Sequence, residues 1–386
     1  MKFNFHVSPS LRSPLTTQQI MKELSIALLV VYACSVGYYA MSYGASYAIH
    51  ALLLMAASLI TTLVCEYGFA KIRKREPIQE MKKSFGWVTA IILTMMVPIS
   101  MRVYALVIAT IFAIVFGKLL FGGFGHNIFN PAAVGRPVIF AAFMGTSGVA
   151  ADVVTSATPT TTLANTFDWL PMNAASLDGF LSQYGGWKAL LLGNYPGALG
   201  ETFSIVIVLA GIYLVVRKII DWRVPVVYCG SIFVMTMVIA LIKGVGSYHG
   251  IPGFIWYPML HLLLGGVLFG AIFMLTDPVT SPTSPAGRVI FALGAAIFTV
   301  LIRCTGNLPE GCLYSILLMN MLTPMIESAL DGKQLEILPK ARKMFAILSV
   351  VALLVCVFCA FSLEGTDSPK GKEQAKLVTE KVGDLL

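Results

Sequence analysis

Apolar runs of about twenty residues recur along the chain, and this is the length that an α-helix needs to cross the hydrocarbon core of a membrane. Charged residues make up 12% of the 386 residues, about half of the roughly 25% found in soluble domains. The chain therefore has too few charged side chains to cover a soluble fold of this size. We expect an all-α polytopic membrane protein built as one bundle of spanning helices.

Hydropathy predicts about ten transmembrane helices and an extra C-terminal one. The expected spans are 20–41, 46–70, 86–101, 103–119, 127–147, 201–217, 224–243, 256–275, 288–305 and 311–330, and the extra helix is 344–362. The third and fourth spans are short and meet at "VPISMRVY", where Pro98 and Arg102 would be costly in a straight helix facing lipid. Pairs of this kind can be broken helices that line a cavity.

The basic residues predict the orientation in the membrane. Lys and Arg gather in "KIRKREPIQEMKK" (71–83) and "RKIIDWR" (217–223), beside apolar runs, which is the pattern of cytoplasmic loops. The N-terminal segment 1–19 falls on the same side, whereas segment 148–200 falls on the other and has Lys188 as its one basic residue. The net charge of +8 is spread over such clusters and forms no basic groove with interleaved aromatics, so we expect no nucleic-acid partner.

Two irregular turns that feed helices predict an internal repeat. One is "FGGFGHNIFNPA" (121–132) and the other is "GNLPEG" (306–311), five spans further on. Because five is odd, the turns face opposite sides of the membrane, as in an inverted five-helix repeat. The predicted organisation is a cytoplasmic segment (1–19), two repeats (20–147 and 201–331), an extracytoplasmic loop (148–200) between them and a C-terminal extension (332–386).

The segment "DVVTSATP" (152–159) is a compact loop rich in hydroxyl groups. It can be an ordinary Ser/Thr-rich external turn. A surface threonine is a poor nucleophile unless a base activates it, and the sequence has no histidine near this loop. Any covalent use of Thr158 would therefore need an outside enzyme.

Other polar residues stand at the edges of predicted spans. Asn127 and Asn130 lie beside three glycines, and Asp277 lies in the proline-rich link "TDPVTSP". They can belong to tight helix-helix turns, or they can contact a polar ligand. Arg303 can pair with Glu310, or it can hold a phosphate that arrives from the hydroxyl loop, since a guanidinium suits phosphate oxygens.

These motifs together resemble one family. "FGGFGHNIFNPA", "TDPVTSP", "GNLPEG" and a D-x-x-T-S-A-T loop, with the N-terminal "SPSLRSPLTTQQIM", resemble the D subunit of the Rnf ion-translocating electron-transfer complex over roughly residues 8–331. Its relative, the B subunit of the sodium-translocating NADH:quinone reductase, is the second choice. The resemblance also implies a fold similar to that of urea transporters.

The resemblance implies two flavins. One is FMN, which a flavin transferase attaches through a phosphoester to the threonine that corresponds to Thr158; Ser156 stands where glycine is more usual. The other is a non-covalent riboflavin inside the bundle, for which Asn127, Asn130 and Asp277 are our candidates. We expect no metal site and no catalytic residue in this chain, which would be a subunit of an ion-translocating oxidoreductase that is not catalytic alone.

Three functions are compatible with these features. The first is a redox subunit in the inner membrane of a bacterium, which relays electrons between ferredoxin-side and NAD-side partners and is coupled to Na⁺ or H⁺ movement. The resemblance implies the A, B, C, E and G subunits of Rnf as its partners, within membrane lipid. The second is a transporter or channel for a small polar solute, and the third is a scaffold without cofactors.

Overall fold

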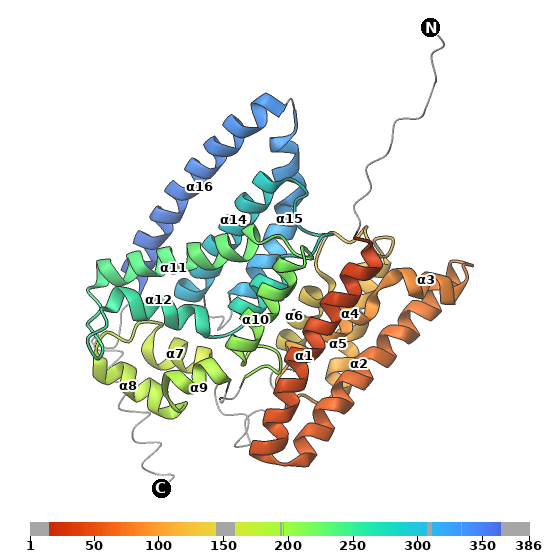
Figure 1. The fold of residues 1–386 in the computed structure, drawn as a ribbon, viewed down its shortest axis with the longest axis horizontal. Helices are drawn as coiled ribbons and strands as arrows, with labels where there is room; N and C mark the ends of the chain where they lie inside the picture. Colours follow the sequence, from red (N-terminus) through yellow and green to blue (C-terminus); the bar gives the residue numbers. More distant parts are fainter. Residues whose placement is uncertain are drawn as a thin grey trace.

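The computed structural model describes residues 15–143, 159–193, 195, 197–306, 311–332 and 334–363. Within these ranges every regular element is a helix, apart from two isolated β-bridges (Figure 1). The all-α prediction is confirmed for this part of the chain. Thr16 caps the first helix by accepting a hydrogen bond from the Gln19 amide.

The first part of the bundle comprises α1 (Thr17–Tyr43), α2 (Ala45–Ile72), α3 (Pro77–Ser84), α4 (Gly86–Met95), α5 (Val103–Ile114), the π-helical turn η1 (Val115–Leu119) and α6 (Pro131–Phe143). Three short helices follow, namely α7 (Pro159–Phe167), α8 (Ala174–Gln183) and α9 (Gly186–Leu192). The second part comprises α10 (Ser204–Val216), α11 (Arg223–Lys243), α12 (Gly253–Leu263), α13 (Val267–Phe269), the π-helical turn η4 (Gly270–Met274), α14 (Pro285–Thr305), α15 (Cys312–Leu330) and α16 (Gln334–Ser362).

Among the described residues, six helices are long and apolar enough to cross a membrane, namely α1, α2, α11, α14, α15 and α16. A seventh span is possible if α12 and α13–η4, which meet at an angle of 69°, count as one. The protein is therefore a multi-pass membrane protein. Each of the eleven predicted spans contains a helix, but the expected number of about ten full-length spans is not confirmed, because the described parts of α4, α5–η1, α6 and α10 have only 10–17 residues.

Irregular turns set the end of α4 and the start of α6. α4 ends at Met95 because the chain turns before Pro98, as the sequence "VPISMRVY" indicated. α6 begins at Pro131, whose ring has the backbone angle of a first helical residue and whose missing N–H is not needed there.

The turn after α4 is paired with a second irregular segment inside the bundle. The Leu199 amide donates to the Val97 carbonyl (3.0 Å) and the Gly200 amide to the Met95 carbonyl (2.6 Å). A Cβ atom at Gly200 would lie 2.6 Å from the Met95 Cβ atom, so this close approach requires glycine. Backbone groups that a membrane cannot solvate are thereby satisfied within the protein.

Turn 120–130, which belongs to the pair chosen from the sequence, resembles a second described turn, 275–284. Turn 120–130 follows η1 and enters α6 through "PAAVGR", whereas turn 275–284 follows η4 and enters α14 through "PAGR". The second partner in the sequence-based pair, 306–311, lies largely outside the described residues. The inverted repeat itself stays a prediction.

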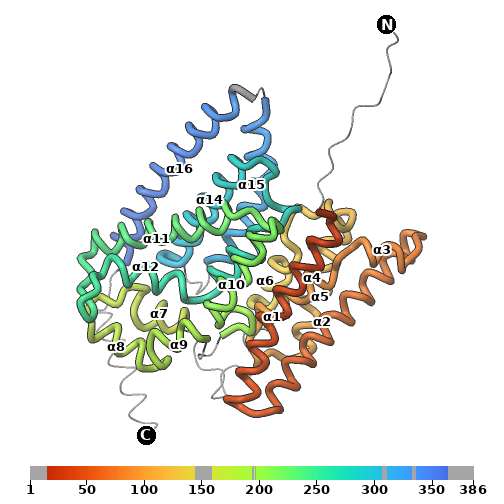
Figure 2. Tube along the Cα trace, in the orientation of Figure 1, coloured from red at the N-terminus to blue at the C-terminus, as the bar shows by residue number. Residues whose placement is uncertain are grey.

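The segment predicted as a long loop, 148–200, contains three helices in its described part. α7, α8 and α9 lie at the end of the molecule opposite to the start of α1, next to α12 (Figure 2). Their inner faces are buried through Leu163, Phe180 and Leu190. The end of α16 lies at the same end of the molecule, where the Lys243 ammonium donates to the Leu363 carbonyl (2.6 Å).

Candidate functional site

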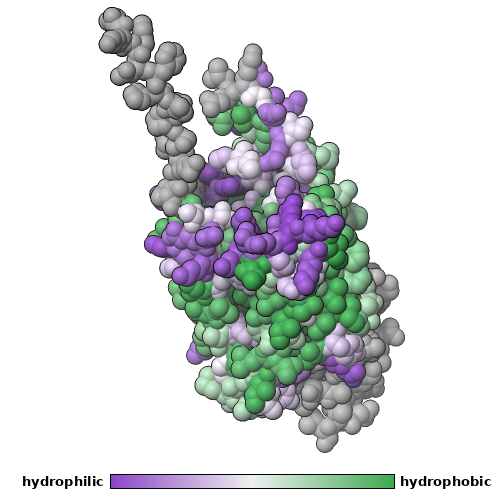
Figure 3. Space-filling model, turned by 90° about the vertical axis from the view of Figure 1, so that its right-hand side faces the viewer, coloured by the Kyte–Doolittle hydropathy of each residue, from purple (hydrophilic) through white to green (hydrophobic). Residues whose placement is uncertain are grey.

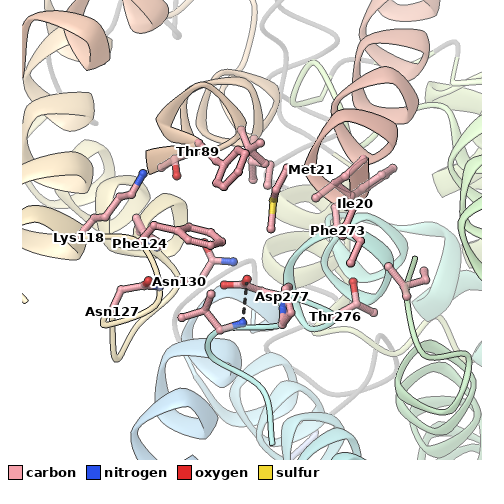
Figure 4. A pocket seen from close by; sticks show the side chains of 18 of the residues that line it. Ile20, Met21, Thr89, Lys118, Phe124, Asn127, Asn130, Phe273, Thr276 and Asp277 are labelled. Carbon is pink, nitrogen blue, oxygen red and sulfur yellow. Dashed lines mark hydrogen bonds between the residues drawn. The ribbon is translucent and has the colours of Figure 1, made fainter. Parts of the chain in front are cut away.

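Three polar residues that the sequence singled out, Asn127, Asn130 and Asp277, line one pocket (Figure 4). Its walls come from the start of α1, from α4 and η1, and from the two turns 120–130 and 275–284. We call it the asparagine pocket. Its void of about 60 Å³ has room for a few water molecules.

Asn130 is mainly a structural residue. Its Oδ1 atom accepts a hydrogen bond from the Ala132 amide (3.1 Å) and so caps α6. Its own amide donates to Oδ1 of Asn320 on α15 (3.0 Å), and its Nδ2 atom approaches the Met274 carbonyl (3.5 Å). The contacts with Asn320 and Met274 connect turn 120–130 to α15 and η4 in the second part of the bundle.

Asn127 has more hydrogen-bonding capacity left than Asn130. Its Nδ2 atom donates to the Phe129 carbonyl (3.1 Å), which holds the side chain in its turn. The residue is 7% exposed and lines the asparagine pocket, whereas the neighbouring His126 lines a different pocket. Of the three candidate residues for riboflavin, Asn127 is the one whose side chain makes the fewest hydrogen bonds within the protein.

The Asp277 carboxylate shapes its own turn. Oδ1 accepts from the Val279 amide (3.3 Å) and Oδ2 accepts from the Thr280 hydroxyl (3.1 Å). Removal from water raises the pKa of the Asp277 carboxyl, although these hydrogen bonds and the charge of Lys118 act in the opposite direction.

A bidentate ion pair closes one wall of the pocket. Arg217 at the end of α10 donates from Nε and Nη2 to the two carboxylate oxygens of Glu23 on α1 (3.0 and 2.7 Å). The following residues, Ile219 and Ile220, line the pocket opposite Met21 of α1. The fork geometry fixes the two helix ends relative to each other.

Sequence reasoning missed a buried ion pair next to this pocket. Lys118 of η1 lines the pocket, and its Nζ atom lies 3.2 Å from Oε1 of Glu66 on α2 and 2.5 Å from the Ser84 carbonyl. The two side chains are 3% and 4% exposed. Opposite charges inside predicted spans 46–70 and 103–119 were the available signal, because ionisable groups in membranes pair with each other.

Arg303 has partners that neither sequence-based alternative included. Its guanidinium donates to the carbonyls of His261 (2.7 Å) and Leu264 (2.8 Å), where α12 ends, and lies 5.2 Å from the centre of the Trp169 ring. The residue is 1% exposed, and its Nε atom has no hydrogen-bond partner among the described residues. Glu310 lies outside the described residues.

The NQR2, RnfD, RnfE family is matched over residues 4–336. The chain belongs to this family. The matched region includes the asparagine pocket and Arg303 and ends where α16 begins.

Relatives in the family carry names that agree with the resemblance seen in the motifs. The chain is 36% identical to the D subunit of the proton-translocating ferredoxin:NAD(+) oxidoreductase complex of Clostridium ljungdahlii, over 84% of this chain and 93% of the relative. It is 34% identical to the D subunit of the Na(+)-translocating ferredoxin:NAD(+) oxidoreductase complex of Acetobacterium woodii, over 83% and 91%. The resemblance to the D subunit of the Rnf complex is thus confirmed.

The predicted attachment residue in this family member, Thr158, lies outside the described residues, as does Ser156. The hydroxyl residues that follow are in α7, where Thr160 is 3% exposed and Thr162 is hydrogen-bonded to the Tyr184 hydroxyl (2.5 Å). Thr160 and Thr162, which are close to Thr158 in the sequence, are therefore packed inside the protein.

Proposed function

We propose that this chain is the membrane-embedded redox subunit of an Rnf-type complex that transfers electrons between ferredoxin and NAD⁺. It relays electrons between the ferredoxin-side and NAD-side partners, coupled to translocation of Na⁺ or H⁺. Family membership, with relatives named as subunits of such complexes, is the observation that carries the proposal. The names of two relatives specify different ions, so the proposal leaves the ion open.

The asparagine pocket is the proposed site of a non-covalent riboflavin. A flavin ring has hydrogen-bonding atoms along one edge and apolar faces, and the pocket combines Asn127, Asp277 and Lys118 with apolar walls that include Phe124 and Phe273. The void of about 60 Å³ is small, so binding requires flexible side chains at its edge to rotate. A bound flavin supplies one- or two-electron transfer, and the chain supplies orientation and electrostatics.

The proposed covalent cofactor is FMN, esterified to Thr158 by a flavin transferase. The D-x-x-T-S-A-T motif supports this proposal, as does the burial of Thr160 and Thr162, because a transferase needs an accessible hydroxyl. Arg303 remains our candidate for the phosphate, through the Nε atom that has no partner among the described residues. That contact requires Arg303 to become accessible, since it is 1% exposed.

The proposed setting is the inner membrane of a bacterium, with residues 148–200 on the extracytoplasmic side and the A, B, C, E and G subunits of Rnf as partners. The low content of basic residues in 148–200 supports this orientation. The B subunit of the sodium-translocating NADH:quinone reductase and a solute channel similar to urea transporters are the alternatives. A channel would bind no flavin.

The test is the colour of the purified chain before and after denaturation. We expect it to be yellow, to release riboflavin on denaturation and to retain a fluorescent band on a denaturing gel under ultraviolet light. Thr158→Val should abolish the band, because the attachment oxygen is gone, and Thr160→Val is the matched control that should keep it. A colourless protein would favour the channel, and a fluorescent Thr158→Val band would exclude Thr158 as the attachment site.

A further inference from the structure

A second pocket lies on the other side of the Lys118–Glu66 pair. Its void of about 200 Å³ is bounded by the end of α2, by α3 and by turn 120–130, which we call the glycine turn. Its charged lining residues are Glu66, Arg73, Arg75, Glu80 and Lys83. We call it the arginine pocket. Neither the motifs nor the proposed electron transfer gives it a role.

The arginine pocket carries a surplus of positive charge. Three cations and two carboxylates line it, and Glu66 is also neutralised by Lys118 at 3.2 Å. The surplus is therefore two positive charges. Arg75 contacts Glu80 (3.1 Å), but Arg73 and Lys83 have no carboxylate within ion-pair distance among the described residues. A ligand that balances this charge is an anion.

The Arg73 guanidinium is held in a fixed position with N–H groups that can still donate hydrogen bonds. Its Nη1 and Nη2 atoms donate to the carbonyls of Gly122 (3.3 Å) and Leu119 (3.1 Å), and its guanidinium lies 4.5 Å from the centre of the Phe69 ring. A guanidinium has five N–H donors, so three remain for a ligand. The glycine turn permits this approach, since Gly122 and Gly123 have φ of 123° and 101°.

The pocket lies at the border between hydrophilic and hydrophobic surface. On the adjoining part of α2, Val64, Tyr67 and Ile72 are 64%, 45% and 78% exposed, as expected for side chains that face lipid. Figure 3 shows a band of hydrophilic residues above a broad hydrophobic surface on one face of the molecule. An anion bound at this border can be the head group of a lipid whose tails lie along α2.

We propose that the arginine pocket binds a phosphate group, supplied by an anionic phospholipid head group or by free phosphate. Arg73 donates to the phosphate oxygens in a fixed geometry, and Arg75 and Lys83 add charge at the rim. This site is distinct from the proposed riboflavin site, because the two pockets share Phe124 alone among their lining residues and are separated by the Lys118–Glu66 pair.

The experiment is a binding titration of the purified full-length chain in detergent. Short-chain phosphatidylglycerol, short-chain phosphatidylcholine and inorganic phosphate are added separately, and binding is followed by calorimetry. Arg75→Gln/Lys83→Gln should weaken binding of the anionic ligand about fivefold per cation removed, since one basic residue contributes about 1 kcal/mol near an anionic lipid. Glu80→Gln should tighten binding, which a damaged pocket would not do.

Lys71→Gln/Lys74→Gln is the matched control, because both lysines belong to the same basic cluster, are exposed and do not line the pocket. It should change the affinity less than twofold. Tight binding of phosphatidylglycerol alone identifies a lipid site, and binding of inorganic phosphate with the same response to the variants identifies a site filled from solution. Equal losses in the two double variants, or no binding of either anion, would overturn the proposal.

Discussion

At the scale of single residues, the Lys118–Glu66 pair connects the two pockets. Lys118 lines the asparagine pocket and Glu66 lines the arginine pocket, and both are almost fully buried. Gly86 lies against the pair, because a Cβ atom there would clash with the Glu66 carboxylate. Each charge was removed from water at a cost that is offset by the other charge, by the Ser84 carbonyl that accepts from Lys118 and by the Ser84 hydroxyl that donates to Glu66.

We expect Glu66→Gln to destabilise the protein by about 3–5 kcal/mol, because it leaves the Lys118 ammonium buried without a counter-charge. The double variant Glu66→Leu/Lys118→Met removes both charges and should be close to wild type in stability. Thermal unfolding in detergent measures all variants. A double variant that loses as much stability as Glu66→Leu and Lys118→Met lose together would mean that the pair does not act as a unit.

Asn127 and Asn130 should respond differently to substitution. Asn127→Leu should release riboflavin with little effect on the melting temperature, because its side chain holds only one short turn. Asn130→Ala should lower stability by about 1 kcal/mol, because it removes the cap of α6. The riboflavin content after acid extraction and the melting temperature are measured together. Retention of riboflavin in Asn127→Leu would argue against the asparagine pocket as its site.

At the scale of the elements, the apolar runs located the helices because burial in lipid dominates their sequence pattern. The apolar runs did not give the helix lengths. α4 ends in a turn whose backbone carbonyls accept hydrogen bonds from the amides of Leu199 and Gly200, about a hundred residues further on in the sequence. The grouping of Asn127, Asn130 and Asp277 could be predicted, because polar groups at the membrane edge need partners. The Lys118–Glu66 pair was missed because each residue stands alone within an apolar run.

Helices α7–α9 were not expected, because seven to ten residues with little capping give a weak local signal. They are held mainly by tertiary contacts, such as Phe167 against Phe180. This part of the chain should lie on the extracytoplasmic side, since it has a single lysine.

Labelling of an exposed residue on α8 tests this orientation. Ser182→Cys, in a background without Cys34, Cys65 and Cys229, should react with an impermeant maleimide in intact cells, because residue 182 is exposed in the fold. Lys82→Cys on α3 is the control for the opposite side and should react only after lysis. The reverse pattern would invert the topology.

At the scale of the whole molecule, α16 is an addition to the part shared with the family. The family match ends at residue 336, whereas α16 continues to Ser362. It packs against α14 and α11 and covers Cys304 of α14, which is 6% exposed. Cys356 and Cys359 are also buried on α16.

A truncated chain that ends at Asp331 lacks α16 and should therefore keep the asparagine pocket but lose the cover over Cys304. None of the residues that line the pocket lies beyond Val279, so the riboflavin content of the truncated chain should be unchanged. In a background where Cys304 is the remaining cysteine, its alkylation by a permeant maleimide should accelerate about tenfold or more, because a packed helix has to open before a buried group reacts. Thr305→Cys, with Cys304 replaced by alanine, is the control, since Thr305 is exposed and its rate should change little on truncation. An unchanged alkylation rate of Cys304 after truncation would mean that α16 does not cover this face. Loss of riboflavin on truncation would mean that α16 supports the asparagine pocket, and that the division between shared core and addition is wrong.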